Sequence, residues 1–500
     1  MLLDERKIEE IVSKVVSTLR TEASLPAAPA PTVEPTEAER EAAPPPPPIE
    51  IEGEGVFREI GEAIAAARQA QGELMALSLK RRGELLDAMR QAGLKHAAEL
   101  ARMAVEETGM GRVEHKILKN EMAARSTPGL EDLPIRTLAG DEGLTLIQGT
   151  PYGTILAITP STNPTSTVIN NAISMVAAGN SVVFCPHPGA RRCTLQTMIL
   201  LNQAILEAQG PRNLLTSVGN PTLRVVVEAM KSPDIHLICA TGGAGVVRAA
   251  LESNKKAIVA GPGNPPVIVD ETADLEKAAR DIIEGACFDN NIPCVAEKIL
   301  VAVEAIADPL LRAMRQRGAY QVTGSDIAHL THLVIQDGEV NKAYIGKDAT
   351  VILEAIGIRA PHDTRLIVLE ADQDHPLVQH EQMMPVLPLV RVRDFERALQ
   401  VALEVEHGFG HTAIIHSRNT EHITRYAQLA GTTIFVANAP SYAWAGLEGE
   451  GYPSLTVAGS SGEGITSARS FLRQRHLVYA GGMLNVAIRG SSAPFSQGGR

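Results

Sequence analysis

Residues 154–190, TILAITPSTNPTSTVINNAISMVAAGNSVVFCPHPGA, decide which fold class the chain can adopt. The apolar runs at 154–159 and 181–185 have the length of buried strands, and residues 167–178 between them have a helical pattern. A strand, a helix and a second strand in succession predict parallel strands joined by a crossover. This stretch therefore predicts an α/β fold with an open, wound sheet.

The same alternation continues along the chain. The first sheet is expected to gain strands at 214–218, 235–240 and 257–260, with helices near 190–208, 222–230 and 245–253. A second α/β stretch starts at Pro266, with a helix at 273–287, a strand at 295–303 and further alternation to about residue 457. Residues 55–133 are helical in pattern, whereas residues 137–150 have the composition of a hairpin.

Composition and charge exclude several classes of protein. At 500 residues the chain is long enough for two or three domains, and its apolar content of 44% is typical of a globular protein. It contains no apolar stretch long enough for a membrane span, and its first residues do not form an export signal. The formal charge of -12 argues against a nucleic-acid surface. The irregularly spaced cysteines form no zinc motif and suit a reducing cytoplasm.

The first 20 residues predict a short amphipathic helix. Apolar residues recur at helical spacing from Ile8 to Leu19, with Glu, Lys and Ser between them. Residues 21–50 are rich in Pro, Ala and Glu and are expected to form an extended linker. A tethered apolar stripe favours a docking peptide that binds a groove on another protein. The alternative is a terminal helix that folds back onto its own domain or frays.

Two loops of the first sheet have features of a dinucleotide site. Residues 235–245, IHLICATGGAG, predict a strand, a glycine turn and a helix, which present backbone N–H groups to a phosphate. Residues 159–166, TPSTNPTS, follow the first strand of this sheet, and Asn163 is expected to hold its amide in place between Thr162 and Pro164. Both loops have ordinary alternatives, because glycine turns are common in α/β proteins and Asn-Pro also starts turns.

Cys294, in the stretch FDNNIPCVAEK at 288–298, is the candidate nucleophile. It follows a proline in a polar loop, where the thiol is expected to be accessible as a thiolate. Beside a dinucleotide, a thiolate can add to an aldehyde while an amide such as that of Asn163 stabilises the oxyanion. Hydride then leaves to the nicotinamide, and a thioester remains on the protein. The other cysteines fall in apolar strands or in helices, where a buried thiol acts as a small hydrophobe: Cys185, Cys193, Cys239 and Cys287.

Several longer segments carry a resemblance to a known family. They are ITPSTNPTSTVINNA (158–172), CPHPGA (185–190), ATGGAGVV (240–247), GPGNPP (261–266), FDNNIPCVAEK (288–298), EQMMPVLP (381–388), EHGFGHTAIIHS (406–417) and SSGEGITS (460–467). From about residue 55 to its end, the sequence resembles the aldehyde dehydrogenase superfamily, and within it the CoA-acylating propionaldehyde and acetaldehyde dehydrogenases of bacterial microcompartments. The resemblance implies an aldehyde dehydrogenase-like α/β fold, with an open wound dinucleotide-binding sheet, an α/β catalytic domain and an oligomerisation hairpin.

The resemblance also implies roles for individual residues. Cys294 corresponds to the family's nucleophile and Asn163 to its oxyanion donor. Glu381 corresponds to the glutamate that holds the nicotinamide ribose, whereas its ordinary alternative is a solvated acid before an apolar turn. The remaining cofactor contacts are implied at Thr159, Pro160, Ser161, Cys185, Pro186, His187, Gly219, Thr241, Gly242, Gly243 and Val246.

Two departures from the hydrolytic members of the family bear on the reaction. Where those enzymes have Glu-Leu-Gly-Gly, with a glutamate that activates water, residues 261–264 are GPGN. Without that base, the thioester is expected to wait for a CoA thiolate. Cys185 stands where hydrolytic relatives often have a lysine near the adenosine ribose, so NAD is expected while NADP stays open.

The resemblance thus implies an NAD-dependent, CoA-acylating dehydrogenase that acts on propionaldehyde or acetaldehyde inside a cytoplasmic microcompartment. Residues 4–19 would then contact a shell or cargo protein. A hydrolytic dehydrogenase, an acyl-phosphate reductase and a non-catalytic scaffold are the alternatives. The hairpin-like segments near 137–150 and 476–489 imply a homo-oligomer, either a dimer or a tetramer. The implied division is a helix (1–20), a linker (21–50), a dinucleotide-binding domain (51–136 and 151–263), a catalytic domain (264–460), and oligomerisation strands with a tail (137–150 and 461–500).

Overall fold

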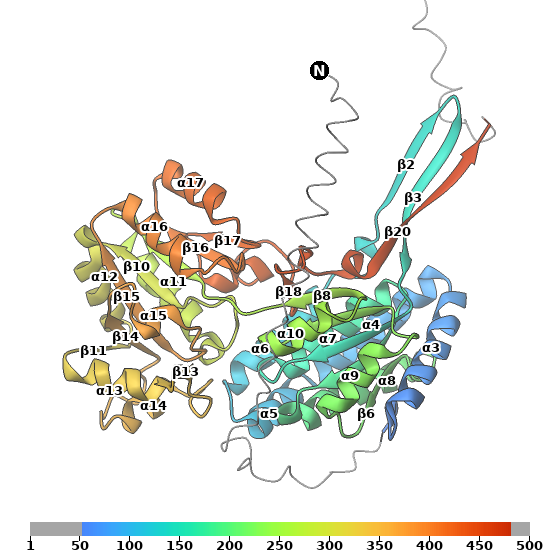
Figure 1. Ribbon diagram of the computed structural model, residues 1–500, viewed down its shortest axis with the longest axis horizontal. Helices are drawn as coiled ribbons and strands as arrows, with labels where there is room; N and C mark the ends of the chain where they lie inside the picture. Colours follow the sequence, from blue (N-terminus) through green and yellow to red (C-terminus); the bar gives the residue numbers. More distant parts are fainter. Residues whose placement is uncertain (1–52, 482–500) are drawn as a thin grey trace, which may run out of the picture. The chain divides into compact units, whose positions relative to one another are not determined.

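The computed structural model describes residues 53–481. The helix predicted within residues 1–20 and the linker predicted at 21–50 lie outside the described residues, as does the second strand expected after the glycine turn near residue 481. Within the described part, the chain forms two large parallel sheets and a smaller antiparallel sheet (Figure 1).

The first large sheet contains six parallel strands in the order β1-β6-β5-β4-β7-β8. Ile155 at its centre pairs with Val182 of β5 on one side and with Leu237 of β7 on the other. Later strands are therefore added on both sides of β4. This arrangement confirms the predicted open, wound sheet. The strands are β1 (Val56–Phe57), β4 (Thr154–Thr159), β5 (Ser181–Pro186), β6 (Leu215–Val218), β7 (Leu237–Thr241) and β8 (Lys256–Ala260).

Helices cover both faces of this sheet. Apolar side chains of α4, α7 and α8 pack on one face, and those of α3, α9 and α10 pack on the other. Every residue of α7 is buried, because this helix lies between the sheet and further helices. None of the helices in residues 53–481 is long and apolar enough to cross a membrane. The helices are α3 (Ile60–Ala76), α4 (Leu79–Lys95), α5 (Ala97–Thr108), α6 (Val113–Ser126), α7 (Pro164–Ala177), α8 (Arg191–Glu207), α9 (Leu223–Lys231) and α10 (Ala244–Leu251).

The second large sheet contains seven parallel strands in the order β11-β14-β15-β10-β9-β16-β17. Helices α11 and α12 pack on one face, and α13 to α17 pack on the other. The strands are β9 (Pro266–Val269), β10 (Ile299–Val303), β11 (Ala319–Val322), β14 (Leu366–Glu370), β15 (Val386–Val392), β16 (Thr412–His416) and β17 (Ile434–Ala437). The helices are α11 (Leu275–Cys287), α12 (Glu304–Gln316), α13 (Ser325–Val334), α14 (Ala349–Ala355), α15 (Pro376–Gln379), α16 (Phe395–Val405) and α17 (Thr420–Ala430).

The strand predicted at 295–303 was wrong at its start, because β10 begins at Ile299. Residues before it form a turn in which the N–H of Ala296 donates to the carbonyl of Pro293 at 3.0 Å. Pairing with β9 starts only where Ile299 lies opposite Pro266. The apolar composition of 295–296 suited a strand, but the turn places Cys294 at the amino end of β10.

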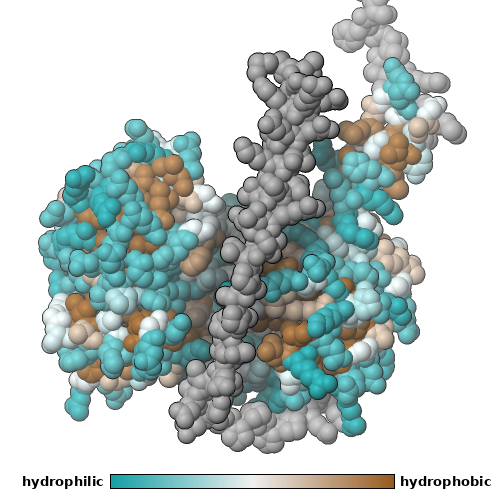
Figure 2. Space-filling model, viewed as in Figure 1, coloured by the Kyte–Doolittle hydropathy of each residue, from teal (hydrophilic) through white to brown (hydrophobic). Residues whose placement is uncertain are grey.

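The antiparallel sheet joins β2 (Ile135–Gly140), β3 (Gly143–Pro151) and β20 (Leu472–Ala480), which confirms the hairpin predicted from composition. It extends away from the large sheets (Figure 1). Large apolar side chains on it are exposed, including Ile135 and Val478 at 67% each, and Figure 2 shows this apolar surface. Exposed apolar strands at sheet edges commonly mark contact surfaces. Oligomerisation through this sheet stays a prediction.

Burial predicts which leucines stabilise the first domain. Leu195→Ala on α8 removes a side chain with no exposed surface, so we expect it to lower the free energy of unfolding by about 2–5 kcal/mol. Leu223→Ala on α9 removes a side chain that is 73% exposed and should change it by less than about 0.5 kcal/mol. Urea unfolding followed by circular dichroism measures both, and equal shifts would contradict the assigned packing.

Candidate active site

A cavity of about 890 Å³ lies where loops of the two large sheets meet. It brings together many of the predicted site residues, although they are distant in the sequence. The first sheet contributes loops that follow β4, β5 and β7, and the second contributes loops that precede β9, β10 and β15. The predicted residues that line it are Pro160, Ser161, Asn163, His187, Thr241, Gly242, Gly243, Cys294 and Glu381.

The strands of the two sheets present opposite ends to this cavity. Ligands of open α/β sheets bind at the carboxyl ends of the strands, and the loop after β4 follows that rule. In the second sheet, Cys294 precedes β10, Pro262 precedes β9 and Glu381 precedes β15, so the amino ends of these strands face the cavity. The loop of Cys294 and the loop after β4 therefore line the same cavity from the two sheets.

Other residues predicted to contact the cofactor do not line this cavity: Thr159, Cys185, Pro186, Gly219 and Val246. Cys185 is fully buried in the core beside Ile158 and Val183, and burial raises the pKa of its thiol to about 12. Its side chain therefore cannot reach a bound ribose, contrary to the role implied by its position in the sequence. It behaves as the small hydrophobe that its strand pattern also allowed.

The loop before Cys294 has a backbone conformation that Asp and Asn tolerate. Asp289, Asn290 and Asn291 have φ angles of 48°, 55° and 67°, in the left-handed region. All three side chains are buried, although the loop is polar in composition. The Nζ of Lys298 donates to the backbone and side-chain oxygens of Asn291, both at 2.6 Å. These contacts hold the backbone that carries Cys294 in one conformation.

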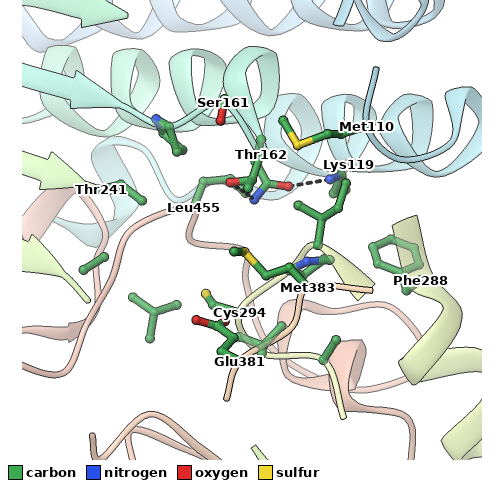
Figure 3. Close-up of a pocket in the computed structure, with 18 of the residues that line it drawn as sticks. Met110, Lys119, Ser161, Thr162, Thr241, Phe288, Cys294, Glu381, Met383 and Leu455 are labelled. Carbon is green, nitrogen blue, oxygen red and sulfur yellow. Dashed lines mark hydrogen bonds between the residues drawn. The ribbon is translucent and has the colours of Figure 1, made fainter. Parts of the chain in front are cut away.

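The Cys294 thiol lines the cavity but is not a ready thiolate. Burial raises its pKa to about 12, and the negative charge of Glu381 raises the pKa further, whereas Lys298 and Lys119 lower it. Figure 3 shows the sulfur next to the Glu381 carboxylate. Cys294 is partly exposed, in agreement with the predicted accessibility, but its raised pKa makes the thiolate the minor form at neutral pH. Attack on a substrate requires that its proton be transferred.

Glu381 is not a solvated acid, so the alternative interpretation of this residue is wrong. Its Oε2 accepts from the N–H of Gly263 at 3.3 Å, and burial raises the pKa of its carboxyl group. Its Oε1 is buried with no hydrogen-bond partner. A buried acceptor without a partner costs free energy, and a hydroxyl donor such as those of a ribose would satisfy it. The chemistry of this oxygen fits the implied nicotinamide ribose.

Asn163 starts helix α7, with Pro164 at the first helical position. Its Oδ1 accepts from Nζ of Lys119, and its Nδ2 donates to Oγ1 of Thr162 at 3.3 Å. Lysine can only donate, so this contact determines which end of the amide carries oxygen. Burial lowers the pKa of Lys119 to about 8, while its nearby partner Asp289 opposes that shift. Figure 3 shows the Lys119 contact at the cavity wall.

Sequence reasoning missed two residues at this site, Lys119 and His411. Nothing in the helical pattern distinguishes Lys119 from the exposed charges of other helices. His411 lies in the segment 406–417, which was noted without assigning it a role. Its ring is buried against Gly263, its Nδ1 contacts Oγ1 of Thr412 at 2.8 Å, and its Nε2 has no partner. Burial lowers its pKa to about 4, so the imidazole is neutral and a weak base at neutral pH.

The segment 261–264 supplies no general base. Asn264 is buried, and its Nδ2 donates to the carbonyls of Val378 at 3.0 Å and Val405 at 2.8 Å. Among residues 53–481, Glu381 contributes the single carboxylate of the cavity lining. An enzyme that hydrolyses a thioester needs a base beside the attacking water. Segment 261–264 therefore offers no base for hydrolysis.

Comparison with known proteins places these features in one family. The family model described as "Aldehyde dehydrogenase family" matches residues 54–449. Acetaldehyde dehydrogenase (acetylating) EutE of Salmonella typhimurium is 47% identical over 431 residues, which cover 85% of this chain and 92% of that protein. Propanal dehydrogenase (CoA-propanoylating) of the same organism is 46% identical over 432 residues, which cover 86% of this chain and 93% of that protein.

Two solved structures are also similar. A propionaldehyde dehydrogenase from the fucose utilisation microcompartment of Clostridium phytofermentans superposes with a TM-score of 0.84 at 48% identity, covering 85% of this chain and 98% of that one. A propionaldehyde dehydrogenase of Rhodopseudomonas palustris, with bound CoA and an acylated cysteine, superposes with a TM-score of 0.85 at 46% identity, covering 86% and 99%.

The charge beside the thiol predicts a change in its reactivity. Glu381→Gln removes the negative charge that raises the pKa of Cys294, so the thiolate fraction below that pKa increases. We expect iodoacetamide to alkylate Cys294 about 2- to 10-fold faster at pH 8, since one pKa unit is tenfold in thiolate. Mass spectrometry of the modified peptide measures the rate.

Glu297→Gln is the matched control for this measurement. Glu297 is also buried and lies close to Cys294 in the sequence, but its carboxylate accepts from the N–H and Oγ of Ser441 at 2.8 and 2.7 Å. Its replacement should leave the alkylation rate unchanged. Equal rates for Glu381→Gln and the unmodified chain would refute the electrostatic assignment.

Proposed function

The chain belongs to the aldehyde dehydrogenase family, and we propose that it is a CoA-acylating member that converts a small aldehyde, CoA and NAD⁺ into acyl-CoA and NADH. The observation that carries this function is the Cys294 thiol in a cavity with Asn163, where segment 261–264 offers no base for water. The named relatives are acylating enzymes of the same kind.

Cys294 and Asn163 perform the first step. The thiol loses its proton as the sulfur attacks the aldehyde carbon, and the carbonyl oxygen gains negative charge. Asn163 donates from Nδ2 to that oxygen, while Lys119 holds Oδ1 at the other end of the amide. A donor aimed at developing charge in a water-poor site stabilises the transition state more than it would in water. The proton leaves to water in the cavity, because His411 does not line the cavity and its lowered pKa makes it a poor proton acceptor.

Residues from both sheets fit a bound nicotinamide nucleotide. When bound, NAD⁺ supplies the hydride acceptor. The glycine turn after β7 offers backbone N–H groups through Gly242 and Gly243, and the Oε1 of Glu381 offers an acceptor for a ribose hydroxyl. The loop of Pro160 and Ser161 after β4 also lines the cavity.

The second half of the reaction transfers the acyl group. Loss of hydride leaves a thioester on the sulfur of Cys294. A CoA thiolate then attacks the acyl carbon, the bond to Cys294 breaks, and acyl-CoA leaves as the cysteine sulfur regains a proton. Because residues 261–264 provide no carboxylate, water competes poorly for the thioester.

Apolar residues favour a small aldehyde without charge. The cavity wall contains Met110, Phe288, Met383 and Leu455, all visible in Figure 3, together with Trp444. An apolar wall discriminates weakly between chains that differ by one methylene. The wall therefore does not rank the two aldehydes, and propionaldehyde is proposed slightly ahead of acetaldehyde because both similar structures are propionaldehyde dehydrogenases.

We place the enzyme in a bacterial microcompartment. The Clostridium phytofermentans relative comes from such a compartment, and the N-terminal stripe of this chain, residues 4–19, has the pattern of a docking peptide. The proposed partner is a shell or cargo protein. The exposed apolar strands β2 and β20 are the proposed contacts of a homo-oligomer.

The proposed reaction is tested by leaving out CoA and following NADH and the acyl adduct on Cys294. With propionaldehyde and NAD⁺ alone, we expect one burst of NADH and an acyl adduct on Cys294, and steady turnover only after CoA is added. Cys294→Ala should lower kcat by more than about 10³-fold, because no other group takes over as nucleophile. Cys287→Ala, which removes a buried thiol at the end of α11, is the control and should keep activity.

Three outcomes would reject this assignment. Full-rate NADH formation without CoA would indicate a hydrolytic dehydrogenase. A requirement for phosphate in place of CoA would indicate an acyl-phosphate enzyme. If the role of the chain in the microcompartment is unchanged in Cys294→Ala, the chain is a non-catalytic scaffold.

Deletion of residues 1–20 tests the proposed location. We expect the truncated enzyme to keep its activity in solution, because the described catalytic residues lie beyond residue 100. Co-purification with microcompartment shells should be lost. Encapsulation that survives the deletion would show that another part of the chain directs it.

A further inference from the structure

Two buried lysines share one buried carboxylate in the wall of the active site. Lys116 Nζ lies 3.0 Å from Oδ2 of Asp289, and Lys119 Nζ donates to the same oxygen. All three side chains are almost completely buried. One carboxylate is balanced by one lysine, so the second cation is not explained by charge neutralisation.

Asp289 connects this pair to the nucleophile loop. It lies in the segment Phe288–Asn291, whose backbone is left-handed at Asp289 and which immediately precedes the turn of Cys294. Its Oδ1 accepts from the N–H of Arg112 at 2.7 Å, and its own N–H donates to Nδ1 of His115 at 2.8 Å. The start of helix α6 is therefore fastened to the segment that carries the nucleophile.

The two lysines differ in what else they contact. Lys116 donates to the backbone carbonyl of Thr162 at 3.1 Å, which supports the loop after β4. Lys119 donates to Oδ1 of Asn163, the side chain that holds the proposed oxyanion donor (Figure 3). Lys119 also lines the cavity, whereas Lys116 does not. Only Lys119 therefore links Asp289 to the amide.

We propose that Lys119 is a positioning residue, which Asp289 holds in place so that it fixes the Asn163 amide with Nδ2 as the donor for the aldehyde oxygen on Cys294. The inference rests on the proposed function. Lysine has no acceptor, so the amide cannot turn its nitrogen toward Nζ without losing the contact. A side-chain donor that is oriented before the reaction stabilises an oxyanion better than one that must reorient. Asp289 thereby fixes the position of the Asn163 amide relative to the Cys294 sulfur.

A double-mutant cycle tests this link. The variants are Lys119→Met, Asn163→Ala and the two combined, and the readout is the single-turnover rate of NADH formation with propionaldehyde and no CoA. Asn163→Ala should slow this step by about 10²-fold or more, as loss of an oxyanion donor does. Lys119→Met should slow it by about 10-fold or more. In the double variant, loss of Lys119 should add far less than this to the effect of Asn163→Ala, since a positioning residue has nothing left to position and only the weak effect of its charge on the pKa of Cys294 remains.

Lys116→Met is the matched control. It removes a buried lysine from the same aspartate on the same helix but leaves the Lys119 contact to Asn163. Its effect on the rate should multiply with that of Asn163→Ala. Thermal melting of both lysine variants should fall by similar amounts, so a rate loss specific to Lys119 is not a loss of folding. If Lys119→Met does not fold, Lys119→Gln, which is too short to reach both partners, replaces it in the same cycle.

The outcomes separate this inference from the proposed function. If the unmodified enzyme forms no acyl adduct on Cys294, the proposed function fails. If it forms the adduct but the effects of Lys119→Met and Asn163→Ala multiply, or Lys119→Met is as fast as the unmodified enzyme, the positioning role is overturned. A double variant close in rate to Asn163→Ala supports it.

Discussion

The buried carboxylate of Asp289 is the contact on which the geometry of the site depends. It belongs to the loop that carries Cys294, yet its partners Lys116 and Lys119 come from helix α6, which precedes the first large sheet's β4 in the chain. A buried carboxylate requires such partners, because it cannot be left unpaired away from water. The backbone at Asp289 is left-handed, and its side chain contacts α6. The chain then continues to Cys294. One ionic cluster thus aligns elements from two separate sheets.

The electrostatics of the cavity suit a thiol that is released only during the reaction. Burial and the charge of Glu381 raise the pKa of Cys294, so the thiolate fraction is small before substrate binds. Lys298 and Lys119 oppose that shift and favour negative charge as it develops. Asn264 is committed to backbone carbonyls and leaves no carboxylate for water. The thioester persists because residues 261–264 offer no carboxylate that could activate water.

The regular elements were predictable because their patterns are local. The strands around 154–159 and 181–185 and the helix between them lie within a few residues of where composition placed them. The start of β10 was misplaced, because apolar residues after Cys294 fill a turn that Lys298 closes with a side-chain contact. Cys185 was assigned to the cofactor by its position in a motif, although its side chain turns into the core.

The sequence by itself determined the wound α/β class, the candidate nucleophile at Cys294 and the absence of a glutamate at 261–264, because each depends on residue type and local period. Only the tertiary structure decided that the thiol is protonated, that Glu381 has an oxygen without a partner and that Lys119 holds Asn163. These properties depend on burial and on the distance between charges from different sheets. Neither quantity exists until the chain has folded.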